Sequence, residues 1–222
     1  MTNLLPELLP LILSDRATSW ALVLVNKHYN DIVTPILYKQ VILQRVGRIK
    51  AFSDTMVSGR PKLRQYPRFL YIIPYAWGRA EFDRLIDIPA VKQILMHVPN
   101  LSHLSLVMSK PRIHSLIKEP RYPFKLRQLD MTVISGAIFI EFLRTQPEIE
   151  HVYLRGGLVV DHFLSTFSAL RKFNLMFSKP GSHDFTSGFC ETVPELSRFD
   201  VWQKSCPSLE EVTIFGITLK KM

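Results

Sequence analysis

One arrangement of apolar positions recurs along the second half of the chain. An apolar residue is followed by two arbitrary positions and then by an apolar–any–apolar triplet, first at residues 101–106. The pattern returns at 126–131, 149–154, 170–175 and 209–214, and the first four copies begin 25, 23 and 21 residues apart. Alternating apolar positions predict a short strand in each copy. Repetition at such a period is typical of a stacked array.

Prolines stand at a fixed place before three of the copies. Pro99, Pro147 and Pro207 each lie two positions before the first apolar residue. Apolar residues with helical spacing precede the first two prolines, at 91–98 and 139–143. Proline ends a helix and favours an extended chain. Each unit is therefore predicted as a helix, a proline stop, a short strand and a loop.

The remaining segments fit this scheme less regularly. Apolar residues with helical spacing at 46–56 precede a strand-like run at 69–73, and 41–43 is expected to start the array. Composition predicts loops at 108–123, which is rich in proline, and at 178–193. Residues 194–205 also fit a strand pattern. We favour a helix there, because a strand would leave too short a return to the next copy.

These units predict an α/β fold in which parallel strands line one side and helices the other. A single unit cannot bury its apolar face alone, whereas stacked copies can. The arrangement over residues 41–222 resembles an irregular leucine-rich-repeat solenoid of alternating helices and short parallel strands, without the asparagine ladder of the regular consensus.

The residues between the apolar positions of each copy are expected to face outward on the strand side. They are polar and mixed in charge, which suits recognition of a protein segment, although a solvated sheet face would have the same composition. These substrate-facing candidates are His103, Ser105, Gln128, Asp130, His151, Tyr153, Lys172, Asn174, Glu211 and Thr213.

The formal charge of +9 is unevenly distributed. Residues 45–68 hold seven basic residues against the single acidic Asp54. Such a segment can contact phosphates or an acidic partner, or can simply be a solvated surface. Nucleic acid is the less favoured partner, because no zinc-finger spacing or nucleic-acid module accompanies the charge. The basic residues are Arg45, Arg48, Lys50, Arg60, Lys62, Arg64 and Arg68.

The N-terminal run MTNLLPELLPLIL only superficially resembles a signal peptide. It has no basic start, and Pro6, Glu7 and Pro10 interrupt it. No uninterrupted apolar run approaches the roughly 18 residues of a membrane span, so no membrane association is expected. Cys190 and Cys206 lack C-x-x-C spacing and are expected to be reduced thiols. The expected location is the cytoplasm or the nucleus.

No motif of a hydrolase, a P-loop or a dinucleotide site occurs, so we expect no enzyme, no cofactor and no metal. Cys206 precedes a proline and is expected to be a buried structural residue. His103 and His151 occupy equivalent places in two copies, where they form either a pair or two surface side chains. None of the histidines has zinc-ligand spacing. They are His28, His97, His103, His114, His151, His162 and His183.

Three N-terminal stretches together resemble the F-box of fungal F-box proteins. They are Leu5-Pro6-Glu7-Leu8-Leu9, the run Leu22 to Tyr29, and Thr34-Pro35-Ile36-Leu37-Tyr38. The resemblance covers residues 4–43 and implies a short helical F-box-like domain at 1–40. It further implies that this domain grips the Skp-family adaptor of a cullin–RING (SCF-type) ubiquitin ligase. The array at 41–222 would then hold a protein substrate, in a chain that is otherwise monomeric.

The sequence departs from the family between the first two stretches. Residues 14–21 form a compact link, in which Asp15 or Thr18 is suited to cap a helix. The same apolar side chains would fill a bundle that binds no adaptor, so a repeat scaffold with a vestigial F-box is the alternative. The adaptor contacts that the resemblance implies are Leu5, Pro6, Leu9, Ile12, Leu24, Val25, Lys27 and Tyr29.

Overall fold

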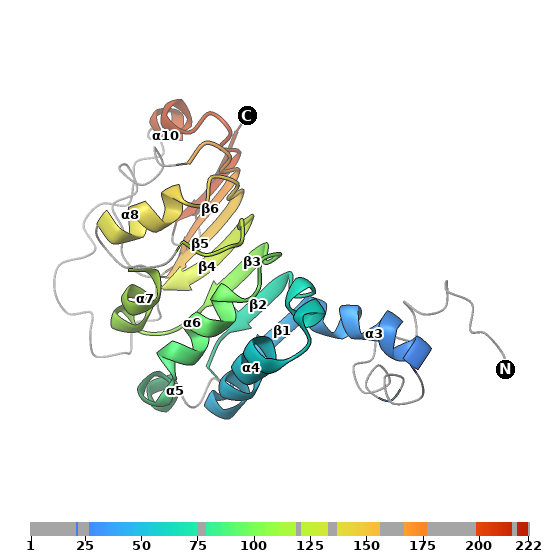
Figure 1. Cartoon of the computed structure of the whole chain (residues 1–222). Helices are drawn as coiled ribbons and strands as arrows, with labels where there is room; N and C mark the ends of the chain where they lie inside the picture. Colours follow the sequence, from blue (N-terminus) through green and yellow to red (C-terminus); the bar gives the residue numbers. More distant parts are fainter. Residues whose placement is uncertain are drawn as a thin grey trace.

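The computed structural model (Figure 1) describes residue 21 and residues 27–74, 79–118, 121–132, 137–155, 167–176, 199–214 and 217–221. These residues form a mixed α/β fold around one eight-stranded sheet. The strands are β1 Gln40–Leu43, β2 Phe69–Ile72, β3 His103–Leu106, β4 Gln128–Thr132, β5 His151–Arg155, β6 Lys172–Met176, β7 Glu211–Ile214 and β8 Ile217–Lys220.

The strands lie side by side in the order of the sequence. Each strand from β1 to β6 pairs in parallel with the next, and β8 closes the sheet by pairing antiparallel with β7. The helices α4, α6, α7 and α8 follow one another along one face of the sheet (Figure 1). The helical elements are α3 Lys27–Lys39, α4 Val46–Ser58, the 3-10 helix η2 Pro61–Gln65, α5 Arg79–Leu85, α6 Ile88–Met96, α7 Lys110–Ile117, α8 Ala137–Arg144 and α10 Phe199–Ser205.

All five copies of the apolar pattern form strands, as the sequence predicts. Each strand from β3 to β7 begins at the third position of its copy. Every apolar position of every copy is buried, and the most exposed of them, Ile214, is only 6% exposed. The strands and the helices therefore share one continuous apolar core, because the inward side chains of each strand meet the helix face opposite.

The three prolines stop helices and start turns, which confirms their predicted role. Helices α6, α8 and α10 end two or three residues before Pro99, Pro147 and Pro207. In each turn a backbone N–H three residues on donates to the carbonyl that precedes the proline. The bond from Leu101 to Val98 is 3.2 Å long, and its equivalents before the other two strands measure 3.3 and 3.0 Å. Proline suits the second position of such a turn, because its φ is already set.

The start of each strand is locked to the previous strand by a repeated hydrogen-bond pair. The N–H groups of Arg127 and Gln128 donate to the Ser102 carbonyl at 2.8 and 3.0 Å. Those of Glu150 and His151 donate in the same way to the Arg127 carbonyl, at 2.9 and 3.0 Å. The register is thus identical from strand to strand, and equivalent side chains fall into straight rows across the sheet.

The prediction of a loop over 108–123 is wrong, because α7 occupies Lys110–Ile117. Pro111 lies in the first turn of this helix. A backbone N–H has no acceptor within the helix at this position, so proline costs no hydrogen bond there. Ile113, Leu116 and Ile117 then form a buried helical face. Proline was interpreted as a breaker where it is a helix starter.

The earlier units agree with the sequence prediction, with helix α4 between strands β1 and β2. The helix expected at 194–205 is present from residue 199 onward. Residues 1–20, 22–26, 177–198 and the loop predicted at 178–193 lie outside the described residues. Within the described segments no helix is both long and apolar enough to cross a membrane.

Candidate binding face on the strands

The ten predicted outward residues form two straight rows, because the strands are in register. We call this side of the sheet, opposite the helices, the strand face. The first row runs His103, Gln128, His151, Lys172 and Glu211, and the second runs Ser105, Asp130, Tyr153, Asn174 and Thr213. Neighbouring residues of a row are 21 to 39 positions apart in the sequence but lie only about 4.8 Å apart across the sheet.

Nine of these ten residues are exposed or half-buried, and one is not. Ser105 occupies its predicted row on the strand face, but it is only 4% exposed. Its hydroxyl instead donates to Asp130 Oδ2 at 3.0 Å. A short side chain between longer neighbours is easily covered, and this one positions a carboxylate.

A hollow of about 210 Å³ lies in the strand face over β2 to β5. It brings together five predicted outward residues from both rows, two predicted apolar positions and two residues that were not predicted. We call this site the hollow. It is lined by Tyr71, His103, Leu104, Ser105, Gln128, Asp130, Tyr153, Leu154 and Arg155.

A charged pair forms the polar part of the hollow. Arg155 Nε donates to Asp130 Oδ1 at 3.1 Å, and Arg155 Nη2 donates to Asp130 Oδ2 at 2.9 Å. These hydrogen bonds to Asp130 raise the pKa of the Arg155 guanidinium. The side chain of Arg155 is 41% exposed and that of Asp130 is 19% exposed. The carboxylate is therefore covered, while the guanidinium still meets solvent.

Aromatic side chains border the charged pair. Tyr71 and Tyr153 occupy the same row as Ser105 and Asp130, one strand to either side of them. At the adjacent position of the first row, the rings of Phe69 and His103 lie 4.3 Å apart between centroids. The hollow thus combines apolar ring surface with a fixed ionic group, which is a common composition for a protein-binding pocket.

His103 and His151 are both half-buried in the first row, with Gln128 of β4 between them. Two strand spacings separate them by roughly 10 Å, which is too far for a shared metal ligand pair. Burial lowers the pKa of His103, and the positive fields of His151 and Arg127 lower it further. No group of three metal-ligating side chains occurs among the described residues.

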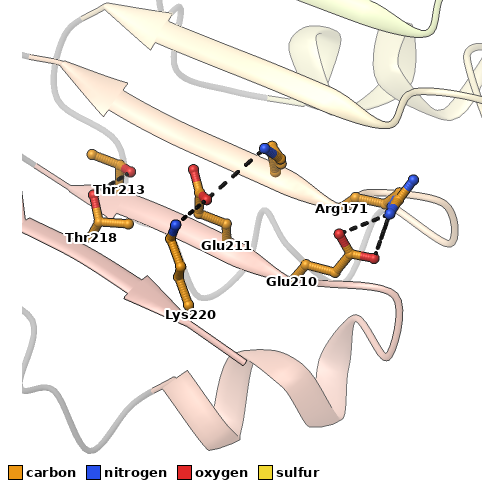
Figure 2. Close-up of polar contacts among 7 residues, drawn as sticks. Arg171, Glu210, Glu211, Thr213, Thr218 and Lys220 are labelled. Carbon is orange, nitrogen blue, oxygen red and sulfur yellow. Dashed lines mark hydrogen bonds and ion pairs between the residues drawn. The ribbon is translucent and has the colours of Figure 1, made fainter. Parts of the chain in front are cut away.

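Polar groups at the C-terminal end of the sheet largely pair with one another (Figure 2). Glu211 lies between Lys220, at 3.4 Å, and Lys172, at 4.0 Å. The hydroxyls of Thr213 and Thr218 are 3.0 Å apart. At the starts of the strands Arg171 forms a forked contact with Glu210, with a shortest distance of 2.8 Å. These groups already have partners, so the hollow is the better candidate for binding.

Two residues of the hollow were missed by the sequence reasoning. Arg155 follows the last apolar position of its copy and continues the same alternation by one step. Tyr71 lies in the predicted strand at 69–73, which was not given outward positions. Outward positions recur at every second residue of a strand. Applying this rule to β2 and to the last residues of each strand would have identified both.

Of the predicted adaptor contacts, only Lys27 and Tyr29 lie within the described residues. They occupy the first turn of α3, where Lys27 is exposed and Tyr29 is half-buried. Leu5, Pro6, Leu9, Ile12, Leu24 and Val25 lie outside the described residues.

The basic segment at 45–68 has partly structural roles. Arg64 Nε and Nη2 donate to the carbonyls of Met56 and Val57, each at 2.6 Å, and so cap the end of α4. Arg68 donates to the Asn100 carbonyl at 3.1 Å. The other five basic side chains of the segment are exposed.

Comparison of the sequence with models of known protein families and with curated proteins finds no match.

Proposed function

We propose that the protein is a non-enzymatic substrate-recognition adaptor of an SCF-type ubiquitin ligase. In this proposal the N-terminal F-box-like segment binds the Skp-family adaptor, and the strand face binds a protein substrate. The fold would be a leucine-rich-repeat-like solenoid that follows the F-box-like helices. The observation that carries the substrate half is the alignment of outward side chains into two rows around the hollow.

The sheet topology supports a repeat array. Successive strands pair only with their neighbours in sequence, and each unit adds one strand and its connection to the previous unit. Arrays of this kind expose one extended surface built from equivalent positions of many units. A row of mixed polar and aromatic groups on such a surface suits contact with a protein segment.

The ligase half of the proposal rests on the F-box resemblance. Helix α3 ends at Lys39, and β1 begins at the next residue, without a linker. Tyr38 packs on the core, and its ring stacks on Phe52 of α4 at 6.4 Å between centroids. A partner that contacts α3 would therefore be held in a fixed position relative to the strand face.

The same junction favours a second candidate function. A helix that continues directly into the first strand also caps the array, and repeat arrays need such caps. The alternative is a leucine-rich-repeat-like interaction scaffold whose F-box is vestigial and no longer binds a ligase.

A pull-down with the Skp-family adaptor separates the two. The purified chain is tested at low and high salt beside the double variant Leu5→Asp/Val25→Asp. Binding that persists in high salt and is lost in the variant would support the ligase proposal, because an apolar interface is little screened. Absence of binding by a folded chain would leave the scaffold. Binding that disappears steeply with salt would instead indicate phosphate-type contacts of the basic segment.

A further inference from the structure

The polar groups of the hollow differ in how many hydrogen bonds they form. Asp130 already accepts three hydrogen bonds, two from Arg155 and one from Ser105. Within the described part of the chain, no hydrogen bond engages Arg155 Nη1 or the side-chain amide of Gln128. The hydroxyls of Tyr71 and Tyr153 are equally unengaged there. Three of the roughly four acceptor sites of the Asp130 carboxylate are thus filled, while a charged donor remains open to solvent.

The position of the open donor is fixed. The two bonds from Nε and Nη2 to Asp130 hold the guanidinium plane in one orientation. Nη1 is the part of the fork that Asp130 does not use. A guanidinium held in this way loses little conformational entropy when it takes up an anion.

Neighbouring charges also favour an anionic ligand. Arg127 lies at the start of β4 with 64% of its side chain exposed, and its contact to Glu150 is long, at 3.8 Å. Arg127 lies close enough to His103 of the hollow to act on its charge. A loosely paired cation near the hollow would raise the local concentration of an acidic segment.

We propose that the hollow binds an acidic segment of a partner protein, with a Glu or Asp carboxylate on Arg155 Nη1. An aromatic or aliphatic side chain next to that carboxylate packs against the rings of Tyr71 and Tyr153. The hollow has a volume of about 210 Å³, which suits the one large apolar side chain of this pair. The recognised unit is therefore one acidic residue with one aromatic or aliphatic neighbour. This inference rests on the proposed function, in that the strand face is taken as the substrate surface.

The test uses the full chain and two labelled copolymers of matched length, poly(Glu,Tyr) and poly(Lys,Tyr). Binding is measured by fluorescence anisotropy at about 0.15 M salt, where long-range attraction to the basic chain is screened. We expect poly(Glu,Tyr) to bind and poly(Lys,Tyr) not to bind. Equal binding of both polymers, or no binding of poly(Glu,Tyr) by the folded chain, would overturn the proposal.

Variants with matched charge locate the site. Arg155→Gln should weaken poly(Glu,Tyr) binding at least about tenfold, which corresponds to loss of a charge-assisted hydrogen bond. Arg48→Gln removes the same charge from an exposed position on α4 and should change affinity by less than about twofold. Equal effects of the two variants would mean general charge attraction and would contradict a site in the hollow.

A second pair of variants leaves the Asp130–Arg155 contact intact. Gln128→Glu places a carboxylate in the wall of the hollow and should weaken binding by repulsion. Gln93→Glu makes the same change on the exposed face of α6 and should have little effect. An unchanged affinity of a folded Gln128→Glu protein would also overturn the proposal.

Competition separates carboxylate from phosphate as the recognised anion. Inorganic phosphate and free glutamate are added at equal ionic strength. Displacement by glutamate supports the carboxylate, and displacement by phosphate alone would contradict it. Arg155→Gln should leave adaptor capture unchanged. A chain that captures the adaptor but not poly(Glu,Tyr) would therefore refute this inference without refuting the ligase proposal.

Discussion

Arg155 and Asp130, which are 25 residues apart in sequence, form a two-pronged ion pair across neighbouring strands, with bonds of 3.1 and 2.9 Å. The pair exists because β4 and β5 are parallel and in register, so that Arg155 lies beside Thr132 at the end of β4, one outward position beyond Asp130. Ser105 of β3 completes the contact from the other side. Three consecutive units of the array thus build one polar site.

The ion pair is expected to contribute modestly to stability. A double-mutant cycle with Asp130→Ala and Arg155→Ala should give a coupling free energy of about 1 kcal/mol, because the pair is forked and partly buried. The measurement is chemical denaturation of the four proteins. Arg171 and Glu210 provide the control, since they form a similar fork with both side chains about half exposed. Their cycle should show a smaller coupling, because solvent screens the exposed pair. The same coupling in both pairs would contradict a special role for burial in the hollow.

Gln146 is expected to be the most sensitive polar residue of the core. It is 1% exposed, and its Oε1 accepts a hydrogen bond from the Leu126 N–H at 2.9 Å. Gln146→Leu leaves that N–H buried without a partner and should lower the free energy of unfolding by about 1–3 kcal/mol. Gln93→Leu, at an exposed site on α6, is the control for the change in side chain. Equal melting temperatures of the two variants would refute the assignment.

Arg64 should stabilise the fold rather than bind a partner. Its guanidinium caps the carbonyls of Met56 and Val57, so Arg64→Ala should cost about 1 kcal/mol in thermal or chemical unfolding. Lys62→Ala removes the same charge from an exposed side chain in the same segment and should leave stability unchanged. If Lys62→Ala destabilises as much as Arg64→Ala, the capping role is wrong.

His103 should make stability depend on pH. Burial, followed by the fields of His151 and Arg127, lowers its pKa below the ordinary value of 6.5, while Glu150 opposes the shift. Below pH 6.5 the unfolded chain binds the proton more readily than the folded chain, so this residue destabilises the fold as pH falls. Above 6.5 both states are neutral, and the effect vanishes.

The measurement for His103 is the free energy of unfolding of the native protein and of His103→Gln between pH 5 and 8, on the order of one measurement per half unit. The native protein should lose stability relative to the variant as the pH falls through and below 6.5. A difference that stays constant, or that grows as the pH rises, would contradict the direction of the pKa shift.

Much of the sheet could be predicted from the sequence, because its signal is local and repeated. The apolar triplets, as at Leu101, Leu104 and Leu106, fix which residues face inward. Pro99 and its equivalents fix where the helices end. Parallel neighbours then place the outward residues in rows. Pro111 misled the reasoning, since a proline in the first turn of a helix and a proline in a loop look alike in sequence.

The hollow could be predicted only in part. The alternation in the repeat places the side chains of Gln128 and Asp130 on the outward side of β4. The burial of Ser105, in contrast, depends on the side chains around it. The pairing of Arg155 with Asp130 requires the register between two strands, which a single sequence does not specify. The capping role of Arg64 likewise depends on where η2 turns back on α4.

The most direct test of the account is whether one chain bridges the ligase adaptor and an acidic segment. Skp-family adaptor is immobilised and loaded with the chain, and retention of labelled poly(Glu,Tyr) is then measured. The account predicts retention with the native chain, loss of the polymer alone with Arg155→Gln, and loss of both chain and polymer with Leu5→Asp/Val25→Asp. Failure of the adaptor to retain the folded native chain would contradict the bridging function. Polymer retention that is unchanged by Arg155→Gln would contradict the assignment of the strand face as the site that binds it.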